Sequence, residues 1–272
     1  MLKIHKKGVV YMQITSKEIP AKVKTDADGV IISITEASEH DIGWRKVTIE
    51  PFFDIISKLT KSQMNVFKYI MLIIGERNNV AHCNAELLGN CCKNVSSYTI
   101  NETLRILEKN EFMRKMDSKK YMINPLILYY GADNKKLIKQ YAALSSNKLP
   151  EYENKKWLKI WIINFMETLE NDTGKGPEIW FTGKSLRVVK CLLENMYDGN
   201  NTVKLTQRQI AAKSELGLEL VNQTLKKLKA QDLISYKPNE EGIKINPVCF
   251  AGVSGERRAK ICTAYQRFVD SP

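Results

Sequence analysis

The sequence has no uninterrupted apolar run of about 18 residues, so no segment is predicted to be a membrane-spanning helix. Its start also lacks the apolar stretch and small-residue cleavage site of a secretory signal peptide. We therefore expect a cytoplasmic protein whose 6 cysteines are reduced thiols rather than disulfides. Histidine is scarce as well, with 3 in 272 residues, which leaves few groups for metal binding or acid–base catalysis.

The residues suited to catalysis are also poorly spaced. The histidines are His5, His40 and His82. Their separation does not fit the paired metal-binding histidines of a rolling-circle nicking enzyme. His82-Cys83 with Cys91-Cys92 leaves zinc as an alternative, but no second Cys-x-x-Cys pair completes a usual spacing. Gly183-Lys184-Ser185 resembles the end of a phosphate-binding loop, yet Glu178 stands where that loop requires glycine. We predict no catalytic residue, no metal and no cofactor.

The chain carries a large excess of positive charge. Its 42 Lys and Arg residues against 30 Asp and Glu residues give a net charge of +12. Divided near residue 150, the two halves carry +8 and +4, so neither is a neutral domain with a basic tail. Such an excess favours a polyanionic partner, and we expect double-stranded DNA.

The second half of the chain repeats the pattern of the first. At a spacing of 122 residues, 59–62 (Leu-Thr-Lys-Ser) aligns with 181–184 (Phe-Thr-Gly-Lys), and 123–125 (Ile-Asn-Pro) recurs at 245–247. At a spacing of 121, the stretch 100–105 (Ile-Asn-Glu-Thr-Leu-Arg) aligns with 221–226 (Val-Asn-Gln-Thr-Leu-Lys). We interpret this as two copies of one domain, at 50–145 and 178–272.

Each copy is predicted to contain three helices. The first begins at a capping box formed by Thr60 and Gln63, and its equivalent begins at Thr182. The second covers 85–92 after Asn84, and its equivalent follows a capping box of Thr206 and Gln209. The third covers 97–109 or 218–230. Its apolar residues recur at i, i+4 and i+7, which places them on one buried face. They are Ile100, Leu104 and Leu107, or Val221, Leu225 and Leu228.

Two extended stretches then complete each copy, at 112–115 with 120–123 and at 233–237 with 243–245. Three helices with a tight turn before the third, followed by a β-hairpin, form a winged helix-turn-helix. We therefore predict an α+β fold of two tandem winged helix-turn-helix domains with a small N-terminal β-rich extension. A small α+β domain that binds nothing is the alternative.

The end of the first copy carries a more specific pattern. The stretch 112–144 contains Tyr-Met-Ile-Asn-Pro at 121–125, then Gly131 and a basic helix, Lys-Lys-Leu-Ile-Lys, at 135–139. This stretch resembles the RepL family of plasmid replication initiators from Gram-positive bacteria. The second copy has a similar Gly-Ile-Lys-Ile-Asn-Pro at 242–247, without the tyrosine. The resemblance implies winged-helix domains that bind a replication origin, although a tandem arrangement departs from the single copy expected of that family.

The predicted DNA-reading residues lie on the third helices, on the face that the apolar residues leave free. In such domains the third helix enters the major groove, where Asn and Gln pair with adenine, Arg with guanine and Glu with cytosine. In the first copy they are Ser97, Tyr98, Asn101, Glu102 and Arg105. In the second copy they are Leu218, Glu219, Asn222, Gln223 and Lys226. A solvated polar helix face is the alternative for each of them.

Basic residues outside the third helices are predicted to contact phosphate, which gives affinity without sequence information. On the hairpins they are Arg114, Lys115, Lys119, Lys120, Lys237 and Lys244. Lys135-Lys136 and Arg257-Arg258 form two further clusters at helix starts, where cations oppose the helix dipole. Because the reading residues differ between the copies, we expect one chain to bind an asymmetric site.

The remaining segments are predicted to have structural roles. Residues 1–49 contain β-rich runs at 9–14, 30–34 and 46–49, which we expect to form a small sheet. In the linker, 146–177, the apolar stretch 157–169 is expected to form a buried helix between the two copies.

The sequence leaves several functions open. A non-enzymatic replication initiator is favoured, with replication enzymes (a helicase, primase or polymerase) as further partners and no membrane. A winged-helix transcriptional regulator is the alternative, and a protein in which one copy has lost DNA contact is a third. The oligomeric state is left open.

Overall fold

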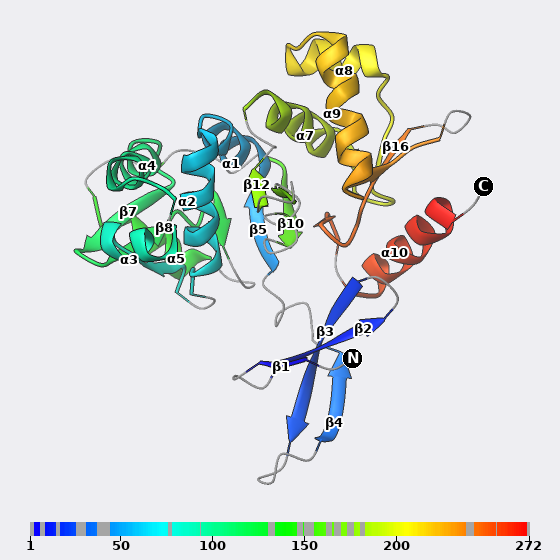
Figure 1. Cartoon of the computed structure of the whole chain (residues 1–272). Coiled ribbons are helices and arrows are strands. Elements are labelled where there is room, and N and C mark those ends of the chain that lie inside the picture. Colours follow the sequence, from blue (N-terminus) through cyan, green and yellow to red (C-terminus); the bar gives the residue numbers. More distant parts are fainter. Residues whose placement is uncertain are drawn as a thin grey trace. The chain divides into compact units, whose positions relative to one another are not determined.

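The computed structural model describes residues 3–5, 9–14, 17–25, 31–36, 44–75, 78–92, 94–129, 134–145, 149, 155–161, 165, 170–172, 177–179, 183–237, 242–253 and 255–270. They form two compact units, Met1–Trp44 and Arg45–Pro272. Helices and small antiparallel sheets alternate along the chain (Figure 1), which confirms the predicted α+β class. Within these ranges, no helix is long and apolar enough to cross a membrane.

The first unit contains an antiparallel sheet in the order β1-β2-β3-β4. Its strands are β1 (Lys3–His5), β2 (Val9–Ile14), β3 (Lys17–Thr25) and β4 (Ile31–Glu36). Strands β2 and β4 agree with the predicted runs. Strand β3 was not predicted, because Pro20 and the charged residues around it weaken the strand pattern. The third predicted run, at 46–49, does not join this sheet.

The second unit contains both copies of the repeat. The first copy consists of β5 (Trp44–Thr48), α1 (Ile49–Ile56), α2 (Lys61–Leu72), β6 (Val80–His82), α3 (Ala85–Cys91), α4 (Ser97–Lys109), β7 (Met113–Asp117), β8 (Lys120–Ile123), β9 (Leu128–Tyr129) and α5 (Lys135–Ala142). The second consists of β10 (Trp157–Trp161), β11 (Glu170–Asp172), β12 (Pro177–Ile179), α7 (Lys184–Glu194), β13 (Met196–Tyr197), β14 (Thr202–Val203), α8 (Gln207–Ser214), α9 (Leu218–Ala230), β15 (Ile234–Ser235), β16 (Ile243–Ile245), β17 (Phe250–Ala251) and α10 (Gly255–Asp270).

The helix starts follow the predicted caps wherever the residues are described. The capping boxes of Thr60 with Gln63 and of Thr206 with Gln209 are both formed, at the starts of α2 and α8. Asn84 caps α3 by accepting a hydrogen bond from the backbone N–H of Leu87. Thr182 lies outside the described residues, and α7 begins after Gly183.

Each hairpin belongs to a larger sheet than the sequence predicted. The first hairpin, β7-β8, gains β6 to give the order β6-β8-β7, and the second gains β14 and β13 to give β13-β14-β16-β15. The additional strands are only two or three residues long. Such short runs show no periodicity in a sequence, so they were missed.

The start of the apolar stretch 157–169 forms strand β10 at 157–161 instead of the predicted helix; of the remainder, only Phe165 is described, and it is helical. Strand β10 shows the alternating burial of a strand, with Leu158 and Ile160 fully buried and Trp157 about half exposed. A short apolar run fits a buried strand as well as a buried helix, and only its partners decide between them. Here β10 pairs with β17, as residue 160 lies opposite residue 250.

Strand β10 completes a sheet that contains strands of both copies. The order is β17-β10-β5-β9, with β5 paired to β9 in the first copy and β10 paired to β17 in the second. The two pairs meet at β10 and β5, which lie side by side in Figure 1. Strand β10 therefore takes the place in the second copy that β5 takes in the first.

Helix α1, which was not predicted, lies at the centre of the hydrophobic core. Its Phe52 is completely buried, and the ring centroid lies 6.1 Å from that of Phe67, 6.4 Å from Phe112 and 6.5 Å from Phe165. Phe165 in turn lies 5.5 Å from Phe250 of the second copy. One cluster of buried residues therefore runs through both copies. A hydrogen bond also joins the two copies, because the Lys190 ammonium group of α7 donates to the Asp54 carboxylate of α1 at 2.6 Å.

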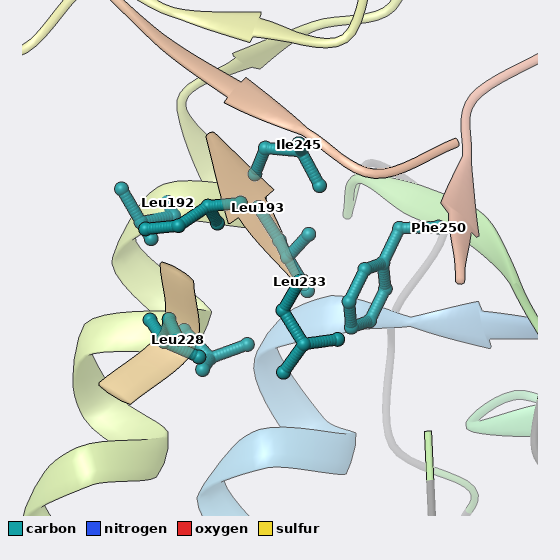
Figure 2. A pocket seen from close by; sticks show the side chains of 8 residues that line it. Leu192, Leu193, Leu228, Leu233, Ile245 and Phe250 are labelled. Carbon is teal, nitrogen blue, oxygen red and sulfur yellow. The ribbon is translucent and has the colours of Figure 1, made fainter. Parts of the chain in front are cut away.

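The core of the second copy leaves a small cavity, shown in Figure 2. Its volume is about 10 Å³, and only apolar side chains line it. They are Val189, Leu192, Leu193, Leu228, Leu233, Ile234, Ile245 and Phe250. An apolar space of this size gives water no hydrogen-bond partner and gives a ligand no room, so we interpret the cavity as a packing defect.

The shared core predicts that the two copies unfold together. We expect Phe52→Ala to lower the free energy of unfolding by about 3–5 kcal/mol, because it removes a completely buried ring and leaves a cavity. Hydrogen exchange should lose protection in both α4 and α9. The control is Leu87→Ala, which truncates a side chain that is 46% exposed and should change stability by less than about 0.5 kcal/mol. Loss of protection in α4 alone would contradict a shared core.

Candidate nucleic-acid interface

The third helix of each copy buries one face and leaves the opposite face to solvent. Helix α4 buries its predicted apolar residues and Thr103, whose hydroxyl donates to the backbone carbonyl of Thr99 at 2.7 Å. Helix α9 buries the equivalent residues and Thr224. The bounds of both helices are the predicted ones. Each helix therefore has one face that the described part of its own unit leaves exposed.

The outer face of α4 carries the residues predicted for the first copy. Ser97, Tyr98, Asn101 and Arg105 are exposed, and Tyr98 is the most exposed of them at 77%. The side-chain amide of Asn101 donates to the backbone carbonyl of Ser97 at 3.0 Å. Glu102 is half-buried and holds Arg105 through two hydrogen bonds. The structure therefore brings these side chains together on one face, about one helical turn apart.

The outer face of α9 is arranged differently. Glu219, Gln223 and Lys226 are exposed, and the Gln223 side-chain amide donates weakly to Glu219 at 3.3 Å. Asn222 is half-buried, so it is less accessible than Asn101, its equivalent in the first copy. Leu218, at the start of the helix, is 40% exposed.

The first hairpin presents its lysines to solvent. Lys115 and Lys119 are exposed, while Lys120 is half-buried and lies 3.4 Å from Asp117. Asp117 also accepts a hydrogen bond from the backbone N–H of Lys119 at 2.8 Å, which closes the turn. This bond, together with the contact to Lys120, lowers the pKa of Asp117. The turn therefore keeps a carboxylate beside its lysines.

The second hairpin is more covered. Lys237 and Lys244 are half-buried, and their ammonium groups lie 5.2 and 5.7 Å from the ring centre of Phe268 in α10. Lys244 also donates to the hydroxyl of Thr202 at 2.9 Å. The ammonium groups of these lysines reach the surface from between neighbouring side chains.

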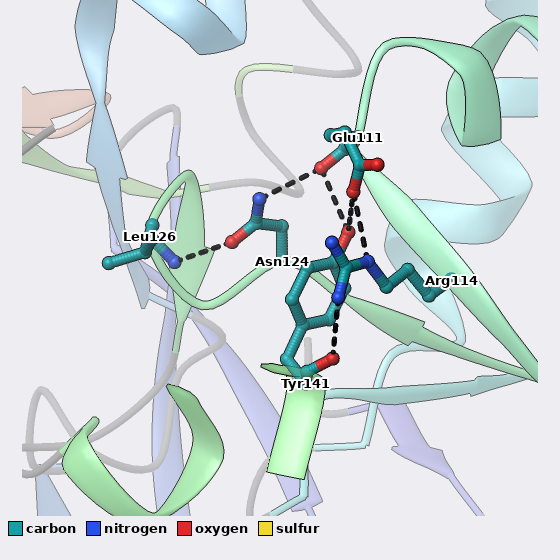
Figure 3. Close-up of polar contacts among 5 residues, drawn as sticks. All are labelled: Glu111, Arg114, Asn124, Leu126 and Tyr141. Carbon is teal, nitrogen blue, oxygen red and sulfur yellow. Dashed lines mark hydrogen bonds and ion pairs between the residues drawn. The ribbon is translucent and has the colours of Figure 1, made fainter. Parts of the chain in front are cut away.

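Arg114 does not have the predicted phosphate-binding position. Its side chain is 6% exposed and lies over the Tyr141 ring, 4.5 Å from the ring centre (Figure 3). It donates to the Glu111 carboxylate at 2.9 Å and to the Tyr141 backbone carbonyl at 3.0 Å. The side chain therefore attaches α5 to the hairpin. The sequence alone could not show that Arg114 is buried while Lys115 is exposed, because the burial of Arg114 depends on α5, which begins 21 residues later.

The basic clusters of α5 and α10 lie in the first turns of these helices, as predicted. Lys135 and Lys136 are exposed on α5, and Arg257 is exposed on α10. Arg258 is half-buried and donates to the backbone carbonyl of Pro247 at 3.2 Å. At least one residue of the second cluster therefore has a structural contact.

The asparagine of each Ile-Asn-Pro motif holds the end of the third helix in place. In the first copy, the Asn124 side-chain amide donates to the Glu111 backbone carbonyl at 2.8 Å, and its oxygen accepts from the Leu126 N–H at 3.0 Å (Figure 3). In the second copy, Asn246 makes the same bonds to Asp232 at 2.7 Å and to Val248 at 2.9 Å. These asparagines therefore connect the third helix to the hairpin strand.

The residue that each asparagine holds has left-handed backbone geometry. Glu111 and Asp232 follow their helices with φ of 56° and 53°. This geometry is uncommon for residues other than glycine and is stabilised here by the hydrogen bonds around it. A tyrosine adds to each site, because the hydroxyl of Tyr141 donates to the Glu111 carbonyl and that of Tyr265 donates to the Asp232 carboxylate, both at 3.0 Å. Burial, and then the neighbouring carboxylate, raises the pKa of both tyrosines.

A second pair of asparagines was not predicted. Asn79 and Asn201 also have positive φ, 56° and 52°, and both side chains are buried. The Asn79 amide donates to two backbone carbonyls, Ile123 at 3.0 Å and Leu128 at 2.7 Å, on either side of the Ile-Asn-Pro turn. The Asn201 amide makes the equivalent bonds at 3.4 and 2.7 Å. Their spacing of 122 residues was a usable signal, since it equals the repeat spacing.

The cysteines and the histidine that suggested a possible zinc site do not form one in the described part of the chain. Cys83 and Cys92 are buried, and burial raises the pKa of each thiol to about 11. Thiols with a raised pKa are poor metal ligands, because the thiolate is the form that binds. His82 and Cys91 are exposed. Within the described ranges, no three residues of the His, Cys, Asp and Glu types are grouped to hold a metal ion.

Comparison with known protein families gives a match that covers most of the chain. A model of the Firmicute plasmid replication protein (RepL) family matches the chain over residues 25–157 and again over 146–271. Each match contains one copy of the repeat, so the family pattern occurs twice in this chain. No curated protein and no solved structure matches the chain.

The asparagine contacts predict equal losses of stability in the two copies. We expect Asn124→Ala and Asn246→Ala each to lower the free energy of unfolding by about 1–3 kcal/mol, because buried backbone groups lose their partners. Urea denaturation measures this effect. The control, Asn90→Ala, changes an exposed residue of α3 and should leave stability nearly unchanged. If either core variant keeps wild-type stability, the proposed link between helix and strand is wrong.

Proposed function

The chain belongs to the Firmicute plasmid replication protein (RepL) family, as its Ile-Asn-Pro motifs predicted, and we propose that it initiates replication by binding double-stranded DNA. We propose that it acts without catalysis, as a sequence-specific protein that binds an origin and recruits replication enzymes such as a helicase, primase or polymerase. Plasmid replication takes place in the bacterial cytoplasm, where we expect the protein. Membership of a replication family favours initiation over transcriptional regulation, the alternative from the sequence.

The observation that carries this proposal is the duplicated third helix with an exposed polar face. We propose that each copy is a winged helix-turn-helix domain, in which α4 or α9 enters the major groove. Asn101, Arg105 and Gln223 are exposed on these helices and have side chains that recognise base edges. The hairpin that follows each helix would then lie along the DNA backbone, where its lysines meet phosphates.

Charge supports the same proposal. The net charge of +12 includes exposed lysines on the first hairpin, on α5 and on α9. They are Lys115, Lys119, Lys135, Lys136, Lys139, Lys226, Lys227 and Lys229. Phosphate contacts from such residues release counterions from DNA, so binding weakens steeply as salt increases.

The shared core supports an asymmetric target. Strands of both copies pair in one sheet, and the ring contacts of Phe52 and Phe165 continue into the second copy. The two third helices therefore belong to one packed body rather than to two freely linked domains. Because their outer faces differ, we propose that one chain binds two unlike half-sites at a fixed spacing.

Binding to duplex DNA should be strongly salt-dependent. With about six to eight phosphate contacts, we expect the affinity to fall roughly a thousandfold between 50 and 200 mM salt. Fluorescence anisotropy with a labelled fragment of the replicon that encodes the protein measures this, and a scrambled duplex of equal length controls for sequence. Failure to bind any duplex at 50 mM salt would contradict DNA binding. Equal affinity for both duplexes at every salt concentration would contradict sequence specificity.

A plasmid-maintenance assay separates initiation from regulation. In a replicon with this protein as its only initiator, we expect the variant Asn101→Ala/Arg105→Ala to cause plasmid loss, because the first copy can no longer read the origin. Asn90→Ala, on the exposed face of α3, is the control and should maintain the plasmid. Quantitative PCR gives the copy number. Normal maintenance in the absence of the protein would contradict an initiator role, and altered expression from a promoter at unchanged maintenance would favour a regulator.

A further inference from the structure

We propose that the two copies divide the work of binding DNA: the first discriminates sequence through Arg105, which Glu102 orients, and the second mainly supplies affinity. This inference rests on the proposed DNA-binding function and extends it to the role of each copy. It differs from the prediction for Glu102 from the sequence, which made this residue a reader of cytosine. In the structure, Glu102 is a positioning residue for its neighbour.

Glu102 holds the Arg105 guanidinium by one edge. The Nε and Nη2 groups of Arg105 donate to the two carboxylate oxygens of Glu102 at 2.8 and 2.6 Å. Each carboxylate oxygen already accepts one of these bonds, so a cytosine amino group would have to share the carboxylate with the guanidinium. The Arg105 side chain is 62% exposed, against 28% for Glu102, so the arginine extends further into solvent.

The free edge of the guanidinium suits guanine. A guanidinium is planar, and the edge formed by Nη1 and the second N–H of Nη2 is not used by Glu102. That edge carries two parallel donors, which match the O6 and N7 acceptors of guanine in the major groove. Fixing the fork before binding reduces the conformational entropy lost on contact, which strengthens a specific contact over a random one.

The pair is maintained at neutral pH. The hydrogen bonds from Arg105 lower the pKa of Glu102, so the carboxylate stays ionised well below neutrality. Solvent screening makes such an exposed pair weak as a source of stability. Its effect is on orientation, because two parallel bonds define the plane of the guanidinium.

The second copy lacks this arrangement. The equivalent positions hold Gln223 and Lys226, and the Gln223 amide donates to Glu219, not to the lysine. An ammonium group is a point charge without a fixed fork, so it suits phosphate better than the edge of one base. Lys226 is exposed, and it has no ion-pair partner among the residues that the structure describes.

The net charges of α4 and α9 also support a division of roles between the two copies. Helix α4 contains two acidic residues (Glu102, Glu108) and two basic residues (Arg105, Lys109), so its net charge is zero. Helix α9 contains one acidic residue (Glu219) and three basic residues (Lys226, Lys227, Lys229), so its net charge is +2. A neutral helix with oriented polar groups favours discrimination, whereas a cationic helix favours attraction to any duplex.

The test exchanges the pair of the first copy for that of the second. The variants are Glu102→Gln and Glu102→Gln/Arg105→Lys, and binding is measured by anisotropy against a set of duplexes that each change one base pair of the wild-type footprint. We expect both variants to lose discrimination at one G·C position by roughly tenfold to a hundredfold. Affinity for scrambled DNA should be retained or slightly increased, because a negative charge is removed. Circular dichroism and thermal unfolding should be unchanged, since the pair is at the surface.

Lys226→Ala is the matched variant in the second copy. We expect it to weaken binding to every duplex in the set by a similar factor, and to reduce the slope of log affinity against log salt by about one. The base preferences should remain those of the wild type.

The outcomes separate this inference from the proposed function. If the wild-type chain binds and discriminates but Glu102→Gln keeps the same preference at every position, Glu102 does not orient a reader and the inference is wrong. If Lys226→Ala changes the preferred base at any position, the second copy reads sequence and the division of roles is wrong. If the wild-type chain binds no duplex at low salt, the proposed function itself fails.

Discussion

The structure of the second unit depends on one apolar core that both copies of the repeat share. Phe52 in α1 packs against Phe165, which follows β10 in the second copy, and Phe165 packs against Phe250. The sheet β17-β10-β5-β9, with two strands from each copy, contributes buried residues to the same core. Burial of apolar surface is the dominant favourable term in folding, so neither copy is expected to keep its structure apart from the other. Because α4 and α9 both contribute residues to this core, it also holds the two helices in place within the unit.

Within that frame, each copy uses the same polar contacts to join its third helix to its hairpin. Asn124 and Asn246 hold the residue after the helix, while Asn79 and Asn201 hold the turn after the hairpin. Burying an amide is costly unless it is hydrogen-bonded, so the bonds that these side chains donate constrain the geometry more strictly than apolar packing does. The Ile-Asn-Pro motif on which the family resemblance depends is therefore a structural motif, and its asparagine does not face solvent.

Differences between the copies are concentrated on the exposed face. The buried residues of α4 and α9 correspond position by position. On the exposed face, Glu102 and Arg105 of the first copy align with Gln223 and Lys226 of the second. A duplicated domain can keep its core and change its outer residues with little effect on folding, because solvated positions contribute little to stability. In this chain the two faces differ in charge and in how their side chains are held, which is what an asymmetric DNA site would require.

The sequence by itself determined the elements that depend on neighbours along the chain. Helical periodicity and capping residues gave the bounds of α4 and α9 and the starts of α2, α3 and α8, because these signals act within one or two turns. The repeat spacing gave the duplication, and the Ile-Asn-Pro motifs gave the family. For the candidate site, the sequence correctly placed Tyr98, Asn101, Arg105 and Lys226 on exposed helix faces.

Only the tertiary structure decided what depends on partners distant in the sequence. Strand β10 was predicted as a helix because an apolar run fits either state until β17 and β5 pair with it. Arg114 was predicted to contact phosphate because its burial against the Tyr141 ring has no local signal in the sequence. The pair of Glu102 and Arg105, in contrast, lies three positions apart on one helix, a spacing that the sequence already contained. Local preference acts between residues a few positions apart, whereas pairing and burial join segments that only the folded chain brings together.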